Sequence, residues 1–328
     1  MFATSLTELF GIEAPIVSAP MDAVAGGELA AAVSRAGGLG LIGGGYGDRE
    51  WLARQFALAG DARVGCGFIT WSLHRQRELL EVALDHDPAA VMLSFGELSP
   101  FAERIAASDA HLMCQVQNRR QARAALDAGA DVLVAQGTEA GGHGYGTRST
   151  MTLVPELADL VAARGLTLPV LAAGGVADGR GLAAALMLGA AGVLVGTRFY
   201  ATTEALSTPQ ARAEMVAATG DETCRTTVYD RLRRYPWPHG HTMSVLRNDL
   251  TDRWAGAEHE LDQQLDAAIT EYREAVAARD YTIANVTVGQ NVGLISTVTS
   301  AGEVVSRMVE QAAACSPTNA SGGDGGSR

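Results

Sequence analysis

Short apolar runs alternate with segments of helical spacing along the first 200 residues of the chain. Runs of four to eight apolar residues are typical of buried β-strands, whereas apolar positions that recur every three or four residues are typical of amphipathic helices. Eight runs fit the strand pattern, and they are Pro15–Ala19, Leu39–Gly43, Arg63–Phe68, Ala90–Ser94, His111–Val116, Val132–Ala135, Val170–Ala173 and Gly192–Val195. The helical pattern fits Gly27–Arg35, Asp48–Ala59, Arg75–Leu84, Arg119–Ala128 and Gly179–Leu188.

This alternation predicts the fold class. Strands that alternate with helices are joined by right-handed crossovers and form a parallel sheet. Eight such units within about 200 residues favour a (β/α)8 TIM barrel, which typically takes roughly 250 residues. A doubly wound open sheet is the structural alternative.

The pattern changes after residue 200, where charged and irregular sequence surrounds the segment Tyr235–His241. Leu261–Arg279 and Ala301–Ala313 have helical spacing, and residues 281–300 return to apolar and glycine character. We therefore divide the chain into four parts. These are a barrel core over residues 1–200, a mostly helical lid over 201–280, a segment over 281–315 that returns to the barrel, and a disordered tail over 316–328.

Composition excludes several classes of function. The net charge of −12 argues against a nucleic-acid partner, and no apolar run reaches the length of a membrane span. The start of the chain lacks a basic leader, so we expect a cytoplasmic protein. The four cysteines are far apart and indicate neither a metal site nor a disulfide framework. All 25 basic residues are arginine, which excludes chemistry through a lysine imine.

The glycine-rich segment after the sixth predicted strand carries the main candidate for catalysis. It reads Gln136-Gly137-Thr138-Glu139-Ala140-Gly141-Gly142-His143-Gly144. The flanking glycines would leave the His143 imidazole unshielded by neighbouring side chains, which suits a general base that works near neutral pH. The alternative is a loop histidine that bonds only to the backbone.

Glycines also follow the seventh and eighth strands, at Gly174, Gly175 and Gly196, and Thr197 comes next. In a barrel these two loops often hold a phosphate. Their backbone N–H groups can do so without lysine, and the helix predicted from Gly179, with Asp178 as its N-cap, would support them. The alternative is that the glycines only form turns.

The ends of the first two strands could present a flat surface to a ring. Ala19, Pro20 and Met21 end the first strand, and Gly43 starts a run of three glycines after the second. Trp71, Phe95 and Tyr145 are further candidates for the rim, although packing is the more frequent role of such side chains.

These motifs resemble those of the nitronate monooxygenases, formerly called 2-nitropropane dioxygenases, a family of FMN-dependent barrel enzymes. The resemblance covers roughly residues 10–200 and 280–312. Its most specific element is Glu139-Ala140-Gly141-Gly142-His143, and it also includes the segments Pro15–Met21, Ala173–Val176, Gly196–Phe199 and Val288–Ile295.

The resemblance implies a role for each matching residue. Pro20 and Met21 would lie against the isoalloxazine, Gln136 would hydrogen-bond the flavin, Gln290 would help to close the site, and His143 would be the catalytic base. The complete set of expected cofactor-binding residues is Ala19, Pro20, Met21, Gly43, Gln115, Gln136, Gly141, Gly142, Gly174, Gly175, Gly196, Thr197 and Gln290. The chain departs from the family pattern after the third strand, at Gly67–Thr70, where one hydrogen bond to the cofactor would be either absent or supplied by Thr70 or Gln115.

The activity implied by the resemblance is the oxidation of alkyl nitronates, and of nitroalkanes if His143 deprotonates them, by dioxygen to a carbonyl compound and nitrite. The main alternative is an NAD(P)H-dependent FMN reductase that acts on quinones or enoyl thioesters. A relationship to inosine monophosphate dehydrogenase is set aside because the sixth loop has no cysteine, and a flavin-storage protein would leave His143 without a role. The expected partners are a small-molecule substrate and O2. Trp237 and Trp254 could contact the substrate or a second copy in a homodimer.

Overall fold

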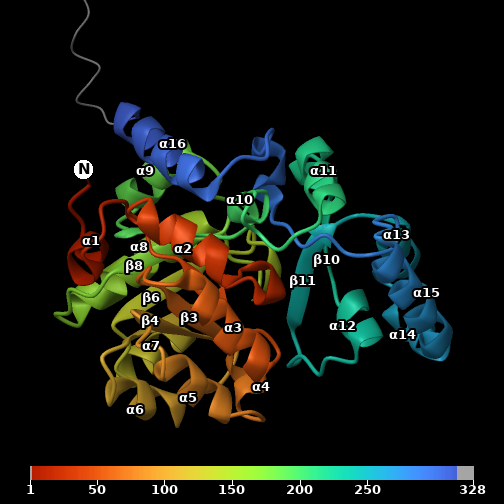
Figure 1. The fold of residues 1–328 in the computed structure, drawn as a ribbon, viewed down its shortest axis with the longest axis horizontal. Coiled ribbons are helices and arrows are strands. Elements are labelled where there is room, and N and C mark those ends of the chain that lie inside the picture. The colour runs from red at the N-terminus through yellow and green to blue at the C-terminus, as the bar shows by residue number, and fades with distance from the viewer. Residues whose placement is uncertain (1, 316–328) are drawn as a thin grey trace, which may run out of the picture.

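The computed structural model describes residues 2–315, and the predicted tail lies outside this range. Eight parallel strands form one sheet in the order β1-β9-β8-β6-β5-β4-β3-β2. A parallel bridge between Val17 and Leu39 joins the two ends of this order and closes a (β/α)8 barrel (Figure 1). The predicted barrel is thus confirmed, and the open doubly wound sheet is wrong. The strands are β1 Ile16–Ser18, β2 Leu41–Gly43, β3 Gly65–Ile69, β4 Ala90–Ser94, β5 His111–Val116, β6 Val132–Gln136, β8 Val170–Ala173 and β9 Gly192–Val195.

Helices surround the barrel, and each of the five predicted ones is present. Asp178 is the N-cap of α9, as predicted, because its carboxylate accepts hydrogen bonds from the N–H groups of Arg180 and Gly181. The surrounding helices are α2 Gly27–Arg35, α3 Arg49–Ala59, α4 Thr70–Leu73, α5 Glu78–Leu84, α6 Phe101–Ala106, α7 Arg119–Asp127, α8 Thr150–Ala163, α9 Gly179–Met187 and α10 Thr197–Tyr200.

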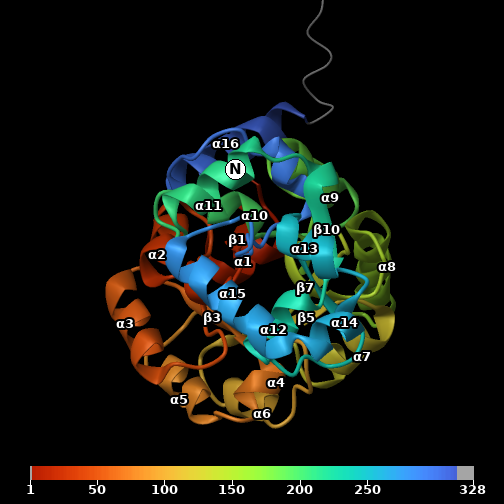
Figure 2. The same ribbon diagram turned by 90° about the vertical axis from the view of Figure 1, so that its right-hand side faces the viewer.

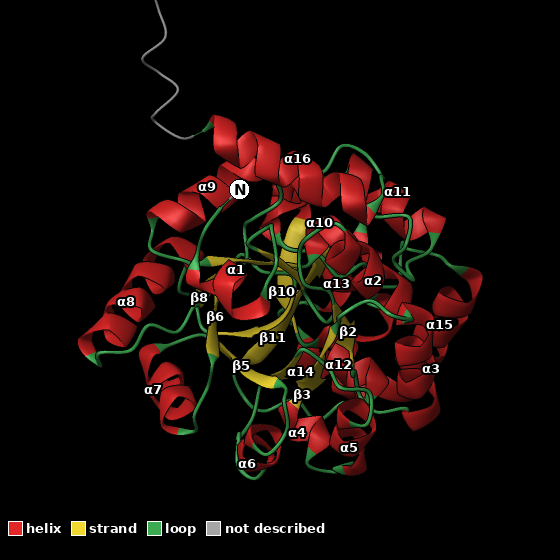
Figure 3. Cartoon of the chain, turned by 60° about the vertical axis from the view of Figure 1, so that its left-hand side comes forward, coloured by secondary structure: helices red, strands yellow, loops and turns green. Residues whose placement is uncertain are grey.

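The strands bury apolar side chains on both faces, which explains their nearly continuous hydrophobic sequences. One group of side chains, including Val17, Met92 and Val134, fills the barrel interior. Helix α1 (Ser5–Phe10) adds Leu6 and Phe10 to this group and lies across one end of the barrel (Figure 3). The ligand cavity must therefore open at the other end.

Residues 201–280, which we call the lid, lie over that other end (Figure 2). Helices α12 Val228–Arg233, α13 Asp249–Trp254, α14 Glu258–Gln263 and α15 Leu265–Ala278 form its core, and α11 Pro209–Ala217 and the short helix η2 Gly220–Glu222 precede them. The hydrophobic pattern did not predict the two lid strands, β10 Thr223–Thr226 and β11 His241–Leu246. They form an antiparallel sheet with β7 (Gly142–Tyr145), in the order β10-β11-β7.

The last part of the chain returns to the barrel. The short helix η3 (Gln290–Leu294) contacts α10 and α11, and α16 (Ala301–Ala314), which was predicted as Ala301–Ala313, packs against α9 and α2. Another short helix, η1 (Asp22–Val24), follows β1 at the barrel mouth. Within residues 2–315, no helix combines the length and the apolar character that a membrane crossing requires.

Candidate active site

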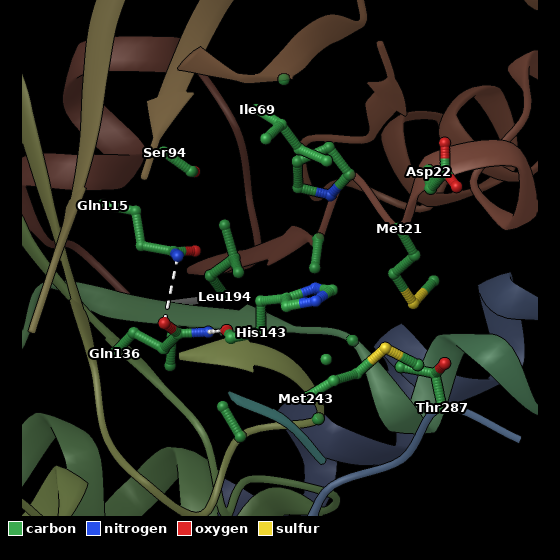
Figure 4. Close-up of a pocket in the computed structure, with 18 of the residues that line it drawn as sticks. Met21, Asp22, Ile69, Ser94, Gln115, Gln136, His143, Leu194, Met243 and Thr287 are labelled. Carbon is green, nitrogen blue, oxygen red and sulfur yellow. Dashed lines mark hydrogen bonds between the residues drawn. The ribbon is translucent and has the colours of Figure 1, made fainter. Parts of the chain in front are cut away.

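A cavity of about 290 Å³ lies between the carboxyl ends of the barrel strands and the lid. This is near the lower end of the roughly 300–1,000 Å³ that is usual for small-molecule sites. Most of the residues predicted from the sequence line it, namely Ala19, Pro20, Met21, Gln115, Gln136, Gly141, Gly142, His143, Gly174, Gly175, Gly196 and Thr197. Figure 4 shows side chains from separate segments converging on this space, among them Met21, His143 and Met243.

Two of the predicted cofactor residues, Gly43 and Gln290, do not line the cavity. A Cβ atom on Gly43 would lie 2.2 Å from the carbonyl oxygen of Asp22, so this glycine allows η1 to pack closely against β2. The side chain of Gln290 is exposed, while its backbone N–H donates to the carbonyl of Glu139 at 2.9 Å. The same C-terminal segment instead presents Asn285, Thr287 and Asn291 to the cavity.

The loops after β8 and β9 can hold a phosphate. Within residues 2–315, the backbone N–H groups of Gly174, Gly175, Gly196 and Thr197 donate to no protein acceptor. Gly174 and Gly175 have φ angles of 104° and 78°, a region that L residues with side chains rarely adopt. Successive free N–H groups in such a conformation form an anion-binding concavity. The residues present therefore fit the phosphate of a flavin mononucleotide.

The N-terminus of α9 does not add to this phosphate site as expected. The N–H of Gly179 donates to the side chain of Gln311 at 3.0 Å, and those of Arg180 and Gly181 donate to Asp178. These helix N–H groups are already satisfied by the protein, so the glycine loops must supply the donors.

Gln136 holds a small network of amide groups in the cavity wall (Figure 4). Its Oε1 accepts hydrogen bonds from Gln115 at 3.1 Å and Gln117 at 2.7 Å, and its Nε2 donates to the carbonyl of His143 at 3.0 Å. Gln136 thus positions the backbone that carries His143. The Oγ1 of Thr70 is buried without a partner within residues 2–315 and does not line the cavity, whereas Gln115 does.

His143 lies on strand β7, and its imidazole is not unshielded as the flanking glycines suggested. Only 9% of its side chain is exposed. The indole of Trp237 stacks on the imidazole with ring centroids 3.5 Å apart and planes 9° apart. Nε2 lies 2.9 Å and 3.0 Å from the two carboxylate oxygens of Asp230, whose side chain is 5% exposed. The lid therefore supplies the surroundings of this histidine.

Burial lowers the pKa of His143, and the adjacent Asp230 opposes this by raising it. A carboxylate can only accept hydrogen bonds, so Asp230 selects the tautomer with the proton on Nε2. The other nitrogen, Nδ1, forms no hydrogen bond within residues 2–315 and is not among the fully buried nitrogens. Nδ1 is then the nitrogen that carries the lone pair and has no protein partner within residues 2–315.

The sequence patterns did not single out two lid residues of this site, namely Arg233, which lines the cavity, and Asp230, which does not line it but contacts His143. Asp230 and Arg233 come from α12, and the guanidinium of Arg233 lies 3.5 Å from Asp230. The two residues are one turn apart on a short helix whose sequence contains no recognisable motif. Only the fold shows that both lie beside His143. Trp237 lines the cavity, where it could contact a substrate, as one of the two expectations for this residue stated. Trp254 is instead buried in the lid core.

Aromatic side chains and one acidic residue also lie at the wall. Tyr46 stacks on Tyr235 with centroids 3.9 Å apart, and its hydroxyl accepts a hydrogen bond from the Trp237 indole at 3.1 Å. Phe95 lines the cavity, whereas Trp71 and Tyr145 do not. Asp22 faces the cavity in a conformation with φ of 48°, and burial raises its pKa.

Comparison with known proteins agrees with this geometry. The sequence profile described as nitronate monooxygenase matches residues 3–61 and 69–311. The chain belongs to the nitronate monooxygenase family. It is therefore an oxidoreductase of a flavoenzyme family, as the resemblance of its motifs implied.

Individual relatives support the membership in this family. The chain is 36% identical to nitronate monooxygenase npaC of Metarhizium robertsii, with 91% of each chain covered. It is 34% identical to a nitronate monooxygenase of Neurospora crassa, over 90% of this chain and 88% of that one. Among solved structures, FabK from Thermotoga maritima is similar, with a TM-score of 0.83, 30% identity, and 96% and 97% of the two chains covered.

Proposed function

We propose that this protein uses FMN to oxidise alkyl nitronates with O2 to a carbonyl compound and nitrite. The observation that carries the proposal is that His143, which pairs with Asp230, lines a cavity that also contains free backbone donors for a phosphate. Membership in the nitronate monooxygenase family supports the reaction class.

His143 is the proposed general base. A proton on the carbon next to a nitro group is acidic because the resulting anion is delocalised, so one neutral imidazole suffices to remove it. The lowered pKa of His143 keeps the ring neutral near pH 7. Asp230 holds the ring through Nε2 and leaves Nδ1 to accept the substrate proton.

The proposed FMN site joins the two sides of the barrel mouth. Gly174, Gly175, Gly196 and Thr197 would hold the phosphate, and the Pro20–Met21 surface would contact the ring system. When bound, FMN supplies the capacity to accept electrons and to react with dioxygen. The protein contributes binding, orientation and proton transfer.

The lid has a second role in this proposal, which is to limit the access of water. Trp237 covers one face of the His143 imidazole and contacts the edges of Trp71 and Phe95. Exclusion of water strengthens the electrostatic interactions within a site. Substrate then meets the imidazole through its edge, where Nδ1 lies.

The experiment is anaerobic mixing of the purified FMN holoenzyme with propionate-3-nitronate, and separately with NADPH and NADH, while the flavin absorbance is followed. We expect the nitronate to bleach the flavin and air to release nitrite and a carbonyl product. Bleaching by a nicotinamide alone would instead support the alternative, an NAD(P)H-dependent FMN reductase. Protein that cannot be loaded with FMN would contradict both functions.

A further inference from the structure

The cavity contains a single permanent positive charge. Arg233 is the only arginine among the described residues that line it, and the chain has no lysine. Building on the proposed function, we propose that Arg233 binds the negative charge of the nitronate and so selects the anionic nitronate over the neutral nitroalkane.

The hydrogen bonds of Arg233 leave part of its guanidinium free. Nε donates to the carbonyl of Tyr229 at 3.1 Å, and Nη2 contacts the sulfur of Met243 at 3.0 Å. Within residues 2–315, Nη1 has no hydrogen-bond acceptor, and it is not among the fully buried nitrogens. A guanidinium presents five N–H donors in a fixed planar arrangement, so an unused edge is suited to a planar anion with two oxygens.

The guanidinium is held in place before any substrate arrives. Its carbon lies 5.3 Å from the centroid of the Tyr235 ring, and its side chain is only 22% exposed. Tyr235 is in turn fixed by stacking on Tyr46. A donor that is already oriented loses little conformational freedom when it binds a ligand.

Arg233 is also next to the proposed base. Asp230 Oδ1 lies 2.9 Å from Nε2 of His143 and 3.5 Å from Nη2 of Arg233. One carboxylate oxygen therefore lies next to both the imidazole and the guanidinium. A nitronate held by Arg233 would therefore lie beside the imidazole.

The acidic groups around Arg233 leave its Nη1 edge without a partner within residues 2–315. Asp230 is shared with the N–H of His143. Asp22 is the acidic residue that lines the cavity, and because burial raises its pKa it carries a negative charge less readily than an exposed aspartate. The Nη1 edge therefore remains available to the anion.

The test compares FMN holoenzymes of the wild type and of Arg233→Gln, with Arg234→Gln as the matched control. Arg234 follows on the same segment, but its side chain is 63% exposed and pairs with Asp266. Sodium nitrite serves as an unreactive planar anion, and its Kd is measured from the change in flavin absorbance. We expect the Kd to rise at least tenfold in Arg233→Gln and to stay unchanged in Arg234→Gln.

Two further variants separate anion binding from indirect effects. Arg233→Lys keeps the charge but loses the planar pair of donors, so its Kd should fall between those of the wild type and Arg233→Gln. Asp230→Asn removes a negative charge and should tighten nitrite binding. If Arg233 acted only by positioning Asp230, then Asp230→Asn would weaken nitrite binding as Arg233→Gln does.

Steady-state kinetics measure the selectivity between the nitronate and the neutral nitroalkane. In Arg233→Gln, the KM for ethylnitronate should rise about 10- to 100-fold, whereas kcat/KM for neutral nitroethane should change by less than about threefold. Wild-type nitrite affinity in folded, flavin-loaded Arg233→Gln would overturn the proposal. Nitrite binding does not depend on turnover. If nitrite binding depends on Arg233 but the protein does not oxidise nitronates, the proposed function is rejected and the anion-binding role of Arg233 is not.

Discussion

At the scale of single residues, the decisive feature is a histidine whose properties come from its surroundings. His143 is buried, stacked beneath Trp237 and bonded to Asp230. Burial favours the neutral imidazole, while the carboxylate orients it and limits the fall in its pKa. The two effects together favour a neutral imidazole in which one nitrogen faces Asp230 and the other does not.

Replacing His143 tests its role as base directly. We expect His143→Gln to lower kcat/KM for neutral nitroalkanes by about 10²- to 10⁴-fold, the usual contribution of a positioned general base. Turnover of preformed nitronates should fall much less, because they have already lost the proton. Steady-state kinetics on both substrates, with flavin content as the control, check this. Equal losses on both substrates would contradict the role as base.

Asp230→Asn should change the pH dependence. Activity requires neutral His143, so kcat/KM for nitroalkanes should fall as the pH decreases through a pKa below the ordinary value of about 6.5. Because Asp230 raises the pKa of His143, its removal should move this acidic limb to still lower pH and reduce the plateau rate. A pH profile of kcat/KM checks this. Asp252→Asn, which removes an exposed partner of Arg247, is the control and should leave the limb in place.

At the scale of elements, the main feature is the sheet that β7 forms with the lid strands. Met243 of β11 is paired in register with His143 of β7, so the lid fixes the backbone of the proposed base. Arg225 of β10 reinforces this connection. Its guanidinium donates to the carbonyls of Thr138 at 3.2 Å and Ala140 at 3.3 Å, and to that of Thr242 at 2.6 Å.

Arg225→Met should therefore loosen the lid and the glycine-rich loop together. The substitution leaves partly buried carbonyl oxygens without donors, which costs about 1–3 kcal/mol for each group that water cannot reach. We expect a lower free energy of unfolding and a higher KM for the nitronate, measured by urea denaturation and steady-state kinetics. Arg253→Met removes an exposed ion pair with Glu271 and should cost no more than about 1 kcal/mol. Similar effects of the two variants would argue against a special role of Arg225.

At the scale of the whole molecule, the barrel, the lid and the C-terminal segment meet around one cavity. The N–H of Gly289 donates to Thr197 at 3.0 Å, and that of Gln290 donates to Glu139, so the returning segment joins the phosphate loop to the sixth loop. A ligand that bridges these parts should stabilise all of them, because it binds only the folded state. Whether two copies form a homodimer stays a prediction.

FMN should stabilise the apoprotein more than riboflavin at equal concentration. Free FMN at 100 times its Kd is expected to add about 2.7 kcal/mol to the free energy of unfolding. Riboflavin lacks the phosphate that the N–H groups of Gly174, Gly175 and Thr197 would bind, so its effect should be smaller. Thermal melts of the apoprotein with each compound check this. Equal shifts in Tm would show that these loops do not hold a phosphate.

The sequence by itself determined the barrel and the glycine loops of its mouth. Strand runs such as Val132–Ala135 are apolar on both faces. A strand that is buried on both sides can therefore be recognised from its own continuous apolar sequence. Glycines at Gly174 and Gly175 likewise mark positive φ angles locally. The lid strands β10 and β11 were missed because their sequences, TCRT and HTMSVL, show no clear hydrophobic alternation.

Only the tertiary structure decided the environment of His143. The flanking glycines suggested an open imidazole, but Asp230 lies 87 positions away in the chain and Trp237 follows it on an irregular segment. Their contacts depend on how the lid folds over the barrel, and no local pattern records a long-range approach of this kind. The sequence therefore indicates which residue could act as a base, whereas the fold determines its surroundings, its tautomer and the arginine that lies beside it.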